Sequence, residues 1–272
     1  MRRALTAVLL TLSVAGCSDK LDTVRCDELG NPCNRPYLQN TMTLLSLRGR
    51  QVPEGSPVDL RSVQITAVDN YDEDEGGSVG SVWVQGRYPV GDPSDRFNPC
   101  PILPDGSARV CGISTFGTVL APTGYHPNVG DLVDVSGGAY DEFDCSGVCG
   151  TPPQPFPDGR FLPQLREPTV RSAGVAPPTA PLPVSINDIL QNNQALIGVL
   201  VEVTDVTATA APDQRGEIAI SPGRDGLKLT QELTPVAGVQ AGTRWDRVVG
   251  VVSYFYGAKL IPRSTADLVN QR

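Results

Sequence analysis

The sequence has few of the residues on which catalytic sites are usually built. Among its 272 residues there are one histidine, His126, and three lysines. A Ser or Cys nucleophile needs a base and an orienting partner nearby in space. No H-E-x-x-H or phosphate-binding glycine loop occurs. His126 lies in the turn-rich segment 122–128, and surface loops tolerate such residues without a chemical role. We therefore expect a protein that is not an enzyme and has no cofactor.

The apolar run near the N-terminus is too short to cross a bilayer. It covers residues 4–14, whereas a membrane-spanning helix needs about 20 apolar residues. Two arginines precede the run, and the small residues Ala15 and Gly16 follow it, directly before Cys17. A charged start, a short apolar core and small residues at the end are typical of a signal peptide. We expect the chain to be exported.

The segment 12–17, Leu-Ser-Val-Ala-Gly-Cys, resembles the lipobox of bacterial lipoproteins. The resemblance implies that residues 1–16 are a lipoprotein signal peptide and that Cys17 carries the lipid. Residues 17–40 would then be a tether in the bacterial cell envelope, with the lipid in the membrane. The alternative is an ordinary secretory signal with a chance cysteine. Ser18 replaces the aspartate that retains lipoproteins in the inner membrane of enteric bacteria, which favours an outer-membrane, periplasmic or surface-facing position.

Basic residues are too few to favour nucleic acid as a tight ligand. The formal net charge is −8, and it becomes −10 without the two arginines of residues 1–16. Residues 41–181 hold 9 basic and 17 acidic side chains, and residues 182–272 hold 8 and 9. Because phosphate binding relies on Lys and Arg, an acidic surface repels nucleic acid. If either region binds a polyanion, we expect it to be the second.

Cysteine spacing predicts disulfides. Apart from Cys17, six cysteines remain, an even number that implies three disulfides in an exported chain, although sequence alone does not fix their pairing. Near neighbours favour Cys26–Cys33, Cys100–Cys111 and Cys145–Cys149. The last pair also has a spacing tolerable for zinc, but an oxidising compartment favours disulfides and no second close ligand pair is present. We expect no metal site among the cysteines.

An acidic run at residues 69–75 is the sharpest polar feature. Clustered carboxylates can hold Ca²⁺ in an exported protein. Its spacing does not match an EF-hand loop, and the glycines that follow suit a solvated hairpin connection, the alternative that we favour.

The sequence predicts an all-β protein with an internal repeat. Its 28 glycines and 25 prolines separate short Val-rich runs. Residues 58–66 align with 201–209, and both alternate apolar and polar residues as a half-buried strand does. Residues 134–140 align with 247–253, and 160–164 align with 259–263. Three matches in the same order predict two copies of one β unit.

Each copy is predicted to have five strands with a bend at Gly137 and at Gly250, as at a barrel corner. We therefore predict two tandem five-stranded OB-like Greek-key barrels. The first covers residues 41–175, a Pro-rich linker covers 176–183, and the second covers 184–272. A short helix is expected at 185–191, with Ser185 as its cap.

The segments 130–137 with 161–165, and 248–254 with 259–264, resemble OB-fold modules attached to secreted bacterial nucleases. The resemblance covers about residues 41–272. In that family a metal-dependent phosphoesterase domain follows these modules, and this chain lacks one.

OB barrels bind oligonucleotides or oligosaccharides on a strand face flanked by loops. Aromatic and basic residues on the predicted strands are therefore candidates for ligand binding. Trp83 is expected to be exposed, because Val82 and Val84 on either side would point inward. The alternative for about half of the rings is a place in the core. The candidates are Trp83, Tyr140, Phe143, Arg247, Tyr254, Tyr256, Lys259 and Arg263.

These observations predict a lipid-anchored envelope protein without catalysis that binds an extended polymer, an oligonucleotide or oligosaccharide, or a partner protein. The alternatives are a purely structural envelope lipoprotein and an accessory subunit of a separately encoded extracellular nuclease.

Overall fold

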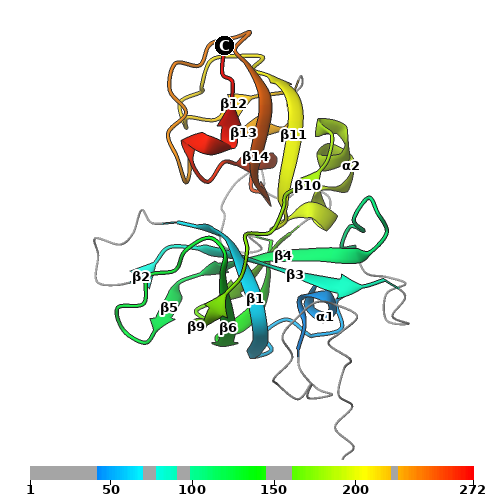
Figure 1. Cartoon of the computed structure of the whole chain (residues 1–272), viewed down its shortest axis with the longest axis vertical. Coiled ribbons are helices and arrows are strands. Elements are labelled where there is room, and N and C mark those ends of the chain that lie inside the picture. Colours follow the sequence, from blue (N-terminus) through cyan, green and yellow to red (C-terminus); the bar gives the residue numbers. More distant parts are fainter. Residues whose placement is uncertain (1–41, 70–77, 91–98, 145–160, 222–225) are drawn as a thin grey trace, which may run out of the picture. The chain divides into compact units, whose positions relative to one another are not determined.

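The computed structural model describes residues 42–69, 78–90, 99–144, 161–221 and 226–272, which belong to one unit starting at Met42 (Figure 1). The signal peptide and tether with Cys17 and Cys26–Cys33 lie outside the described residues. So do Cys145–Cys149 and residues 70–75 of the acidic run. Below, the first half means residues 42–175 and the second half means residues 182–272.

The first half begins with a short helix and continues as a nine-stranded mixed sheet in the order β2-β5-β9-β6-β1-β3-β4-β8-β7. Thr43 caps the helix, because its hydroxyl accepts a hydrogen bond from Ser46 N at 3.0 Å. The elements are α1 (Leu44–Arg48), β1 (Val58–Val68), β2 (Ser78–Val79), β3 (Val82–Pro89), β4 (Ala108–Phe116), β5 (Thr118–Ala121), β6 (Asp131–Gly137), β7 (Ala139–Phe143), β8 (Leu162–Arg166) and β9 (Thr169–Val175).

The second half has a helix near its start, and Ser185 caps it as predicted, in a reciprocal arrangement with Asp188. Its sheet has seven strands in the order β10-β11-β14-β15-β13-β12, with β16 paired to β14. The elements are β10 (Leu182–Pro183), α2 (Ile186–Leu196), β11 (Leu200–Thr207), β12 (Ile218–Ala219), β13 (Lys228–Leu229), β14 (Arg244–Tyr254), β15 (Ala258–Ile261), η4 (Thr265–Asp267) and β16 (Leu268–Val269).

The all-β prediction is confirmed, whereas two closed five-stranded barrels are not. Within the described residues neither sheet closes on itself. In the second half, β11 and β12 are not neighbours in the sheet. Thr209, which follows β11, still bonds to β12, because its N and Oγ1 donate to Ala219 O at 2.8 and 3.0 Å. In the first half, β6 and β7 are separate strands because Gly138 interrupts them in a left-handed conformation (φ 60°).

β8 and β9 are likewise separate strands. Glu167 adopts a left-handed conformation (φ 51°) between them, and Pro168 has no N–H for the sheet. The sheets therefore contain more strands than five each.

The two halves share strand pairing in detail. In the first, β1 pairs with β6, β8 pairs antiparallel with β7 and parallel with β4, and β4 pairs with β3. In the second, β11, β14, β15, β13 and β12 follow the same order, again with one parallel pair, β13 with β15. Val58 lies opposite Gly137, and the aligned Val201 lies opposite Gly250. The aligned residues Ser62 and Asp205 are both left-handed, with φ of 51° and 54°.

Each half has its own apolar core. Tyr140, Leu60 and Ile113 lie in the first, and Trp245, Ile218 and Leu260 lie in the second. Val110 of β4 is an exception, because it belongs to the core cluster of the second half. Cys100 and Cys111 form the predicted disulfide in the described part of the chain, both buried in the first core. No helix among the described residues has the length and apolar character needed to cross a membrane.

Candidate functional site

A row of residues that includes two lysines crosses the sheet of the second half. Ala219, Lys228, Lys259 and Ser253 lie side by side on β12, β13, β15 and β14. The next row, Ile218, Leu229, Leu260 and Val252, is completely buried in the core. Since successive side chains of a strand point to opposite faces, the row with the lysines lies on the outer face of the sheet.

Glu217 joins the two lysines of this row. Its Oε1 lies 2.9 Å from Lys259 Nζ, and its Oε2 pairs with Lys228 Nζ. Lys259 also contacts Glu232 Oε1 at 3.2 Å, and Lys228 lies 4.0 Å from Asp213 Oδ2. Like charges directly opposite each other on a sheet destabilise it. The carboxylate of Glu217 therefore allows the lysines to lie next to each other.

The turn before β12 positions Glu217. Asp213 Oδ1 accepts hydrogen bonds from the backbone N of Arg215 at 2.8 Å and of Glu217 at 3.0 Å. Gln231 Nε2 donates to Gly216 O at 2.9 Å. These bonds fix the residue that enters β12, so the carboxylate position follows from the local turn.

The electrostatics of this cluster favour charged groups. Burial raises the pKa of Glu217, but hydrogen bonds from Lys228 and Lys259 outweigh it, so its pKa lies below the ordinary value. Burial likewise raises the pKa of Asp213, but backbone hydrogen bonds from Glu217 and Arg215, together with Lys228, lower it overall. Both carboxylates therefore stay ionised at neutral pH, as the anions of an ion network.

Aromatic rings border the ion network. Phe255 and Tyr256, in the loop between β14 and β15, meet edge to face at 4.8 Å. Phe143, at the end of β7, stacks on Phe255 at 6.4 Å. Lys259 Nζ lies 5.8 Å from the centre of the Phe255 ring, and the guanidinium of Arg215 lies 5.1 Å from that of Tyr256. Phe143, Phe255 and Tyr256 are half-buried and Arg215 is exposed.

We call this surface the β12–β13–β15 face. It consists of the turn 213–217, Lys228, Glu232, the loop 255–257 and Lys259, with Phe143 beside it. Its cations, Arg215, Lys228 and Lys259, are matched by the carboxylates of Asp213, Glu217 and Glu232. The face can offer rings for stacking and charged groups for hydrogen bonds, with no net excess of positive charge.

Three predicted residues, Phe143, Tyr256 and Lys259, come together at this face. The expectation that Trp83 is exposed is wrong, because it is only 7% exposed and packs against residues of the second half. Tyr140 is 1% exposed and Tyr254 is 5% exposed, so both are core rings that cannot stack on a ligand at the surface.

The two remaining predicted arginines lie elsewhere. Arg247 on β14 pairs with Glu202 of β11 at 3.4 Å. Arg263 follows β15 and pairs with Asp267 at 2.8 Å, while its Nη1 donates to Thr66 O at 3.3 Å. Both are engaged with other groups and neither belongs to the β12–β13–β15 face.

Several residues of the face were not singled out from the sequence. Glu217 directly precedes the two-residue strand β12, and Lys228 lies in the two-residue strand β13. Strands of two residues are too short to be recognised by the alternation of apolar and polar residues. Arg215 and Glu232 lie in connecting segments. Phe255 lies between Tyr254 and Tyr256, which were both predicted to bind a ligand, so its position next to them could have marked it as a candidate.

No group of three or more His, Cys, Asp or Glu side chains in the described part of the chain could hold a metal ion. His126 is exposed between β5 and β6, where its carbonyl accepts a hydrogen bond from Asn128 Nδ2 at 3.0 Å.

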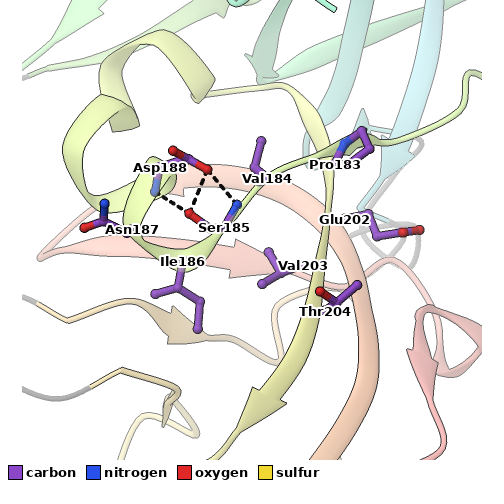
Figure 2. A pocket seen from close by; sticks show the side chains of 9 residues that line it. All are labelled: Pro183, Val184, Ser185, Ile186, Asn187, Asp188, Glu202, Val203 and Thr204. Atoms are coloured by element: carbon purple, nitrogen blue, oxygen red, sulfur yellow. Dashed lines mark hydrogen bonds between the residues drawn. The ribbon is translucent and has the colours of Figure 1, made fainter. Parts of the chain in front are cut away.

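A separate pocket lies where β10 ends and α2 begins, beside the edge of β11 (Figure 2). Within it, Asp188 Oδ2 accepts hydrogen bonds from Ser185 N at 2.8 Å and from Ser185 Oγ at 2.7 Å. These two residues satisfy each other as the helix cap. The lining of the pocket comprises Pro183, Val184, Ser185, Ile186, Asn187, Asp188, Glu202, Val203 and Thr204, none of them a predicted binding residue.

No protein-family model matches the sequence, and no curated protein matches it.

Proposed function

We propose that the protein is a lipid-anchored bacterial envelope protein without catalytic activity, which binds an extended polymer through the β12–β13–β15 face. The lipobox-like segment ending at Cys17 supports the anchor and the envelope location. The outer membrane is the favoured membrane because Ser18 follows that cysteine.

We propose further that each half is an OB-like unit. The shared strand order, with β4 parallel to β8 in the first half and β13 parallel to β15 at the equivalent place in the second, supports this proposal. A barrel of this type is partly open, and its ligands lie on the face of the second and third strands, between the loops that join strands one to two and four to five. In the second half these elements are β12, β13, the loop 208–217 and the loop 255–257, which together carry the rings and the ion network.

The ligand class that fits this face best is an oligosaccharide. Half-buried aromatic rings stack on the apolar faces of sugars, and the charged groups of the network can hydrogen-bond to hydroxyls. A phosphate backbone would need uncompensated cations, whereas both lysines already contact carboxylates. The observation that carries the proposal is this combination of stacked rings with charge-balanced lysines.

A partner protein is the second candidate ligand. Phe116 at the end of β4 and Val119 on β5 are 59% and 54% exposed and stand three residues apart. Exposed apolar side chains that lie close together are a common feature of protein contacts. An adaptor that uses this part of the first half would not need the β12–β13–β15 face.

A binding experiment with two matched variants distinguishes these functions. Hexasaccharides of neutral and uronic-acid sugars and a thymidine 20-mer are titrated into the full chain, Tyr256→Ala and Phe116→Ala by calorimetry. We expect oligosaccharide binding that weakens roughly fivefold in Tyr256→Ala, since an aromatic contact contributes about 1 kcal/mol, and stays unchanged in Phe116→Ala. Tighter binding of the thymidine 20-mer, or no binding of any saccharide, would overturn the proposed ligand class.

A further inference from the structure

The first half has a face that corresponds to the β12–β13–β15 face, and the second half covers it. By strand order this face belongs to β3 and β4. Trp83 of β3 and Ala67 of β1 share an apolar cluster with Leu200, Val249, Val251 and Ile261 of the second half. Alternation along β3 would leave Trp83 on the outer side of the sheet, yet it is only 7% exposed. The second half therefore covers this face and shields it from solvent.

Two glycines bring the backbones of the halves into direct contact. A Cβ on Gly112 of β4 would lie 2.1 Å from Gly198 O, and one on Gly198 would lie 2.5 Å from Gly112 C and Ile113 N. Real side chains do not tolerate such distances from backbone atoms. A glycine inside a strand often marks this kind of close approach of another backbone. At both positions only glycine fits.

Polar groups at the contact are paired across it. Gln85 of β3, which is 3% exposed, accepts a hydrogen bond through Oε1 from Leu200 N at 2.9 Å. Arg263 Nη1 donates to Thr66 O at 3.3 Å. Buried polar groups that are satisfied only by the other half leave unpaired donors or acceptors when the halves separate. The contact is therefore specific and not merely apolar.

The Cys100–Cys111 disulfide lies directly behind this contact. Cys111 stands between Val110, which is buried in the core of the second half, and Gly112. Arg109, which also lies on β4, donates through Nη1 to Cys100 O at 2.7 Å. The disulfide thus fixes β4 where it meets the second half.

We propose that the β3–β4 face of the first half is a docking surface for the second half, so that the two halves act as one body held by this contact and not by the linker alone. If the proposed function holds, polymer binding is then confined to the β12–β13–β15 face, with one binding face per chain. The docking itself does not depend on the polymer, and it can be tested without one.

The test cuts the linker in the otherwise intact chain. A protease recognition sequence is inserted between Ala180 and Pro181, after the part of the linker that Gln64 holds through Pro177 O at 2.8 Å. After cleavage under oxidising conditions, size-exclusion chromatography with light scattering reports whether the fragments stay together at micromolar concentration. We expect one species with the mass of the uncut chain.

Two glycine variants provide the matched control. Gly198→Ala and Gly124→Ala both place alanine at positive φ, 81° and 85°, but only the first meets backbone atoms within 4 Å. We expect Gly198→Ala to weaken the association of the cut halves about a hundredfold or more and Gly124→Ala to leave it unchanged. Hydrogen exchange of β14 shows whether the second half remains folded. If it does not, Gln85→Ala, which removes one cross-contact hydrogen bond, replaces Gly198→Ala and should weaken association about tenfold.

Separation of the unsubstituted halves after cleavage would overturn the proposal. Equal association of the two glycine variants, with both halves folded, would also overturn it. Failure of the polymer titration would leave these outcomes unaffected, so the two proposals fail separately.

Discussion

Replacing Glu217 by Gln tests the ion network on which the β12–β13–β15 face depends. The substitution keeps the shape of the side chain and removes its charge. Lys228 and Lys259 then lie side by side with only Glu232 at 3.2 Å and Asp213 at 4.0 Å to offset them. The side chain of Glu217 is 6% exposed and that of Lys259 is 10% exposed, so solvent screens the repulsion poorly.

The expected loss is about 2–3 kcal/mol in the free energy of unfolding. Breaking a fully buried ion pair costs roughly 3–5 kcal/mol. The Lys228 side chain is 25% exposed, which places this network below that range. In urea the loss corresponds to a midpoint about 1 M lower with an unchanged slope, and equilibrium unfolding followed by circular dichroism measures it.

Glu202→Gln is the matched control. Glu202 pairs with Arg247 at 3.4 Å, and both side chains are more exposed than those of the Glu217–Lys259 pair, at 23% and 47%. Exposed ion pairs contribute about 0–1 kcal/mol, so this variant should unfold close to the unsubstituted chain. Equal losses for the two variants would refute the assignment of a special role to Glu217.

The lowered pKa of Glu217 also predicts that the stability lost in Glu217→Gln depends on pH. The pKa of Glu217 is lower in the folded than in the unfolded chain, so its contribution to stability is complete above the unfolded value, about 4.3, and is lost as pH falls through the folded value. The difference in unfolding free energy between Glu217→Gln and the unsubstituted chain should therefore be constant near neutral pH and shrink in acid. A difference that grows in acid would contradict this sign.

Three further changes test the fold. Replacing Cys100 and Cys111 by Ser opens a loop with a sequence separation of 11 residues and should lower the unfolding free energy by about 3 kcal/mol, measured by urea unfolding without reductant; no loss would contradict a stabilising disulfide. Ser185→Ala removes the cap of α2 and should lower it by about 1 kcal/mol with faster hydrogen exchange in the first helical turn, whereas unchanged exchange would argue against the cap. Leu260→Ala, fully buried, should lower it by about 3 kcal/mol while Val119→Ala, 54% exposed, changes it little; similar effects would contradict the assigned core.

Hydrophobic alternation was sufficient to predict the repeated strands. The aligned segments 58–66 and 201–209 overlap β1 and β11, and the pairs Val58–Gly137 and Val201–Gly250 occupy equivalent registers. A strand with one buried face fixes its register strongly, since a slip of one residue would turn every apolar side chain outward. The disulfide Cys100–Cys111 was also predictable, because near-neighbour cysteines in a chain that is predicted to be exported have few other uses.

The same reasoning failed where a second surface covers a strand. The alternation of side chains along β3 predicts that Trp83 is exposed, but the ring packs in a cluster with Leu200 and Val251 of the second half. Alternation describes one strand and contains no information about a contact more than a hundred residues away in sequence. Gly112 and Gly198, which make that contact, look like ordinary strand and turn glycines in the sequence.

The candidate face was predictable only in part for a related reason. Tyr256 and Lys259 follow the long strand β14 and could be placed from its pattern, but Glu217 directly precedes a strand of two residues and Lys228 lies in another. The contact of Glu217 with both lysines depends on the parallel pairing of β13 with β15, which the sequence does not reveal.

The most direct test of the central claim is an NMR titration of the isotope-labelled full chain with the oligosaccharide that binds best in calorimetry. We predict that chemical-shift changes concentrate on Arg215, Lys228, Phe255, Tyr256 and Lys259, and that Trp83 and Gln85 beneath the second half stay unchanged. Changes centred on the first half, or no changes with any oligosaccharide at saturating concentration, would contradict it.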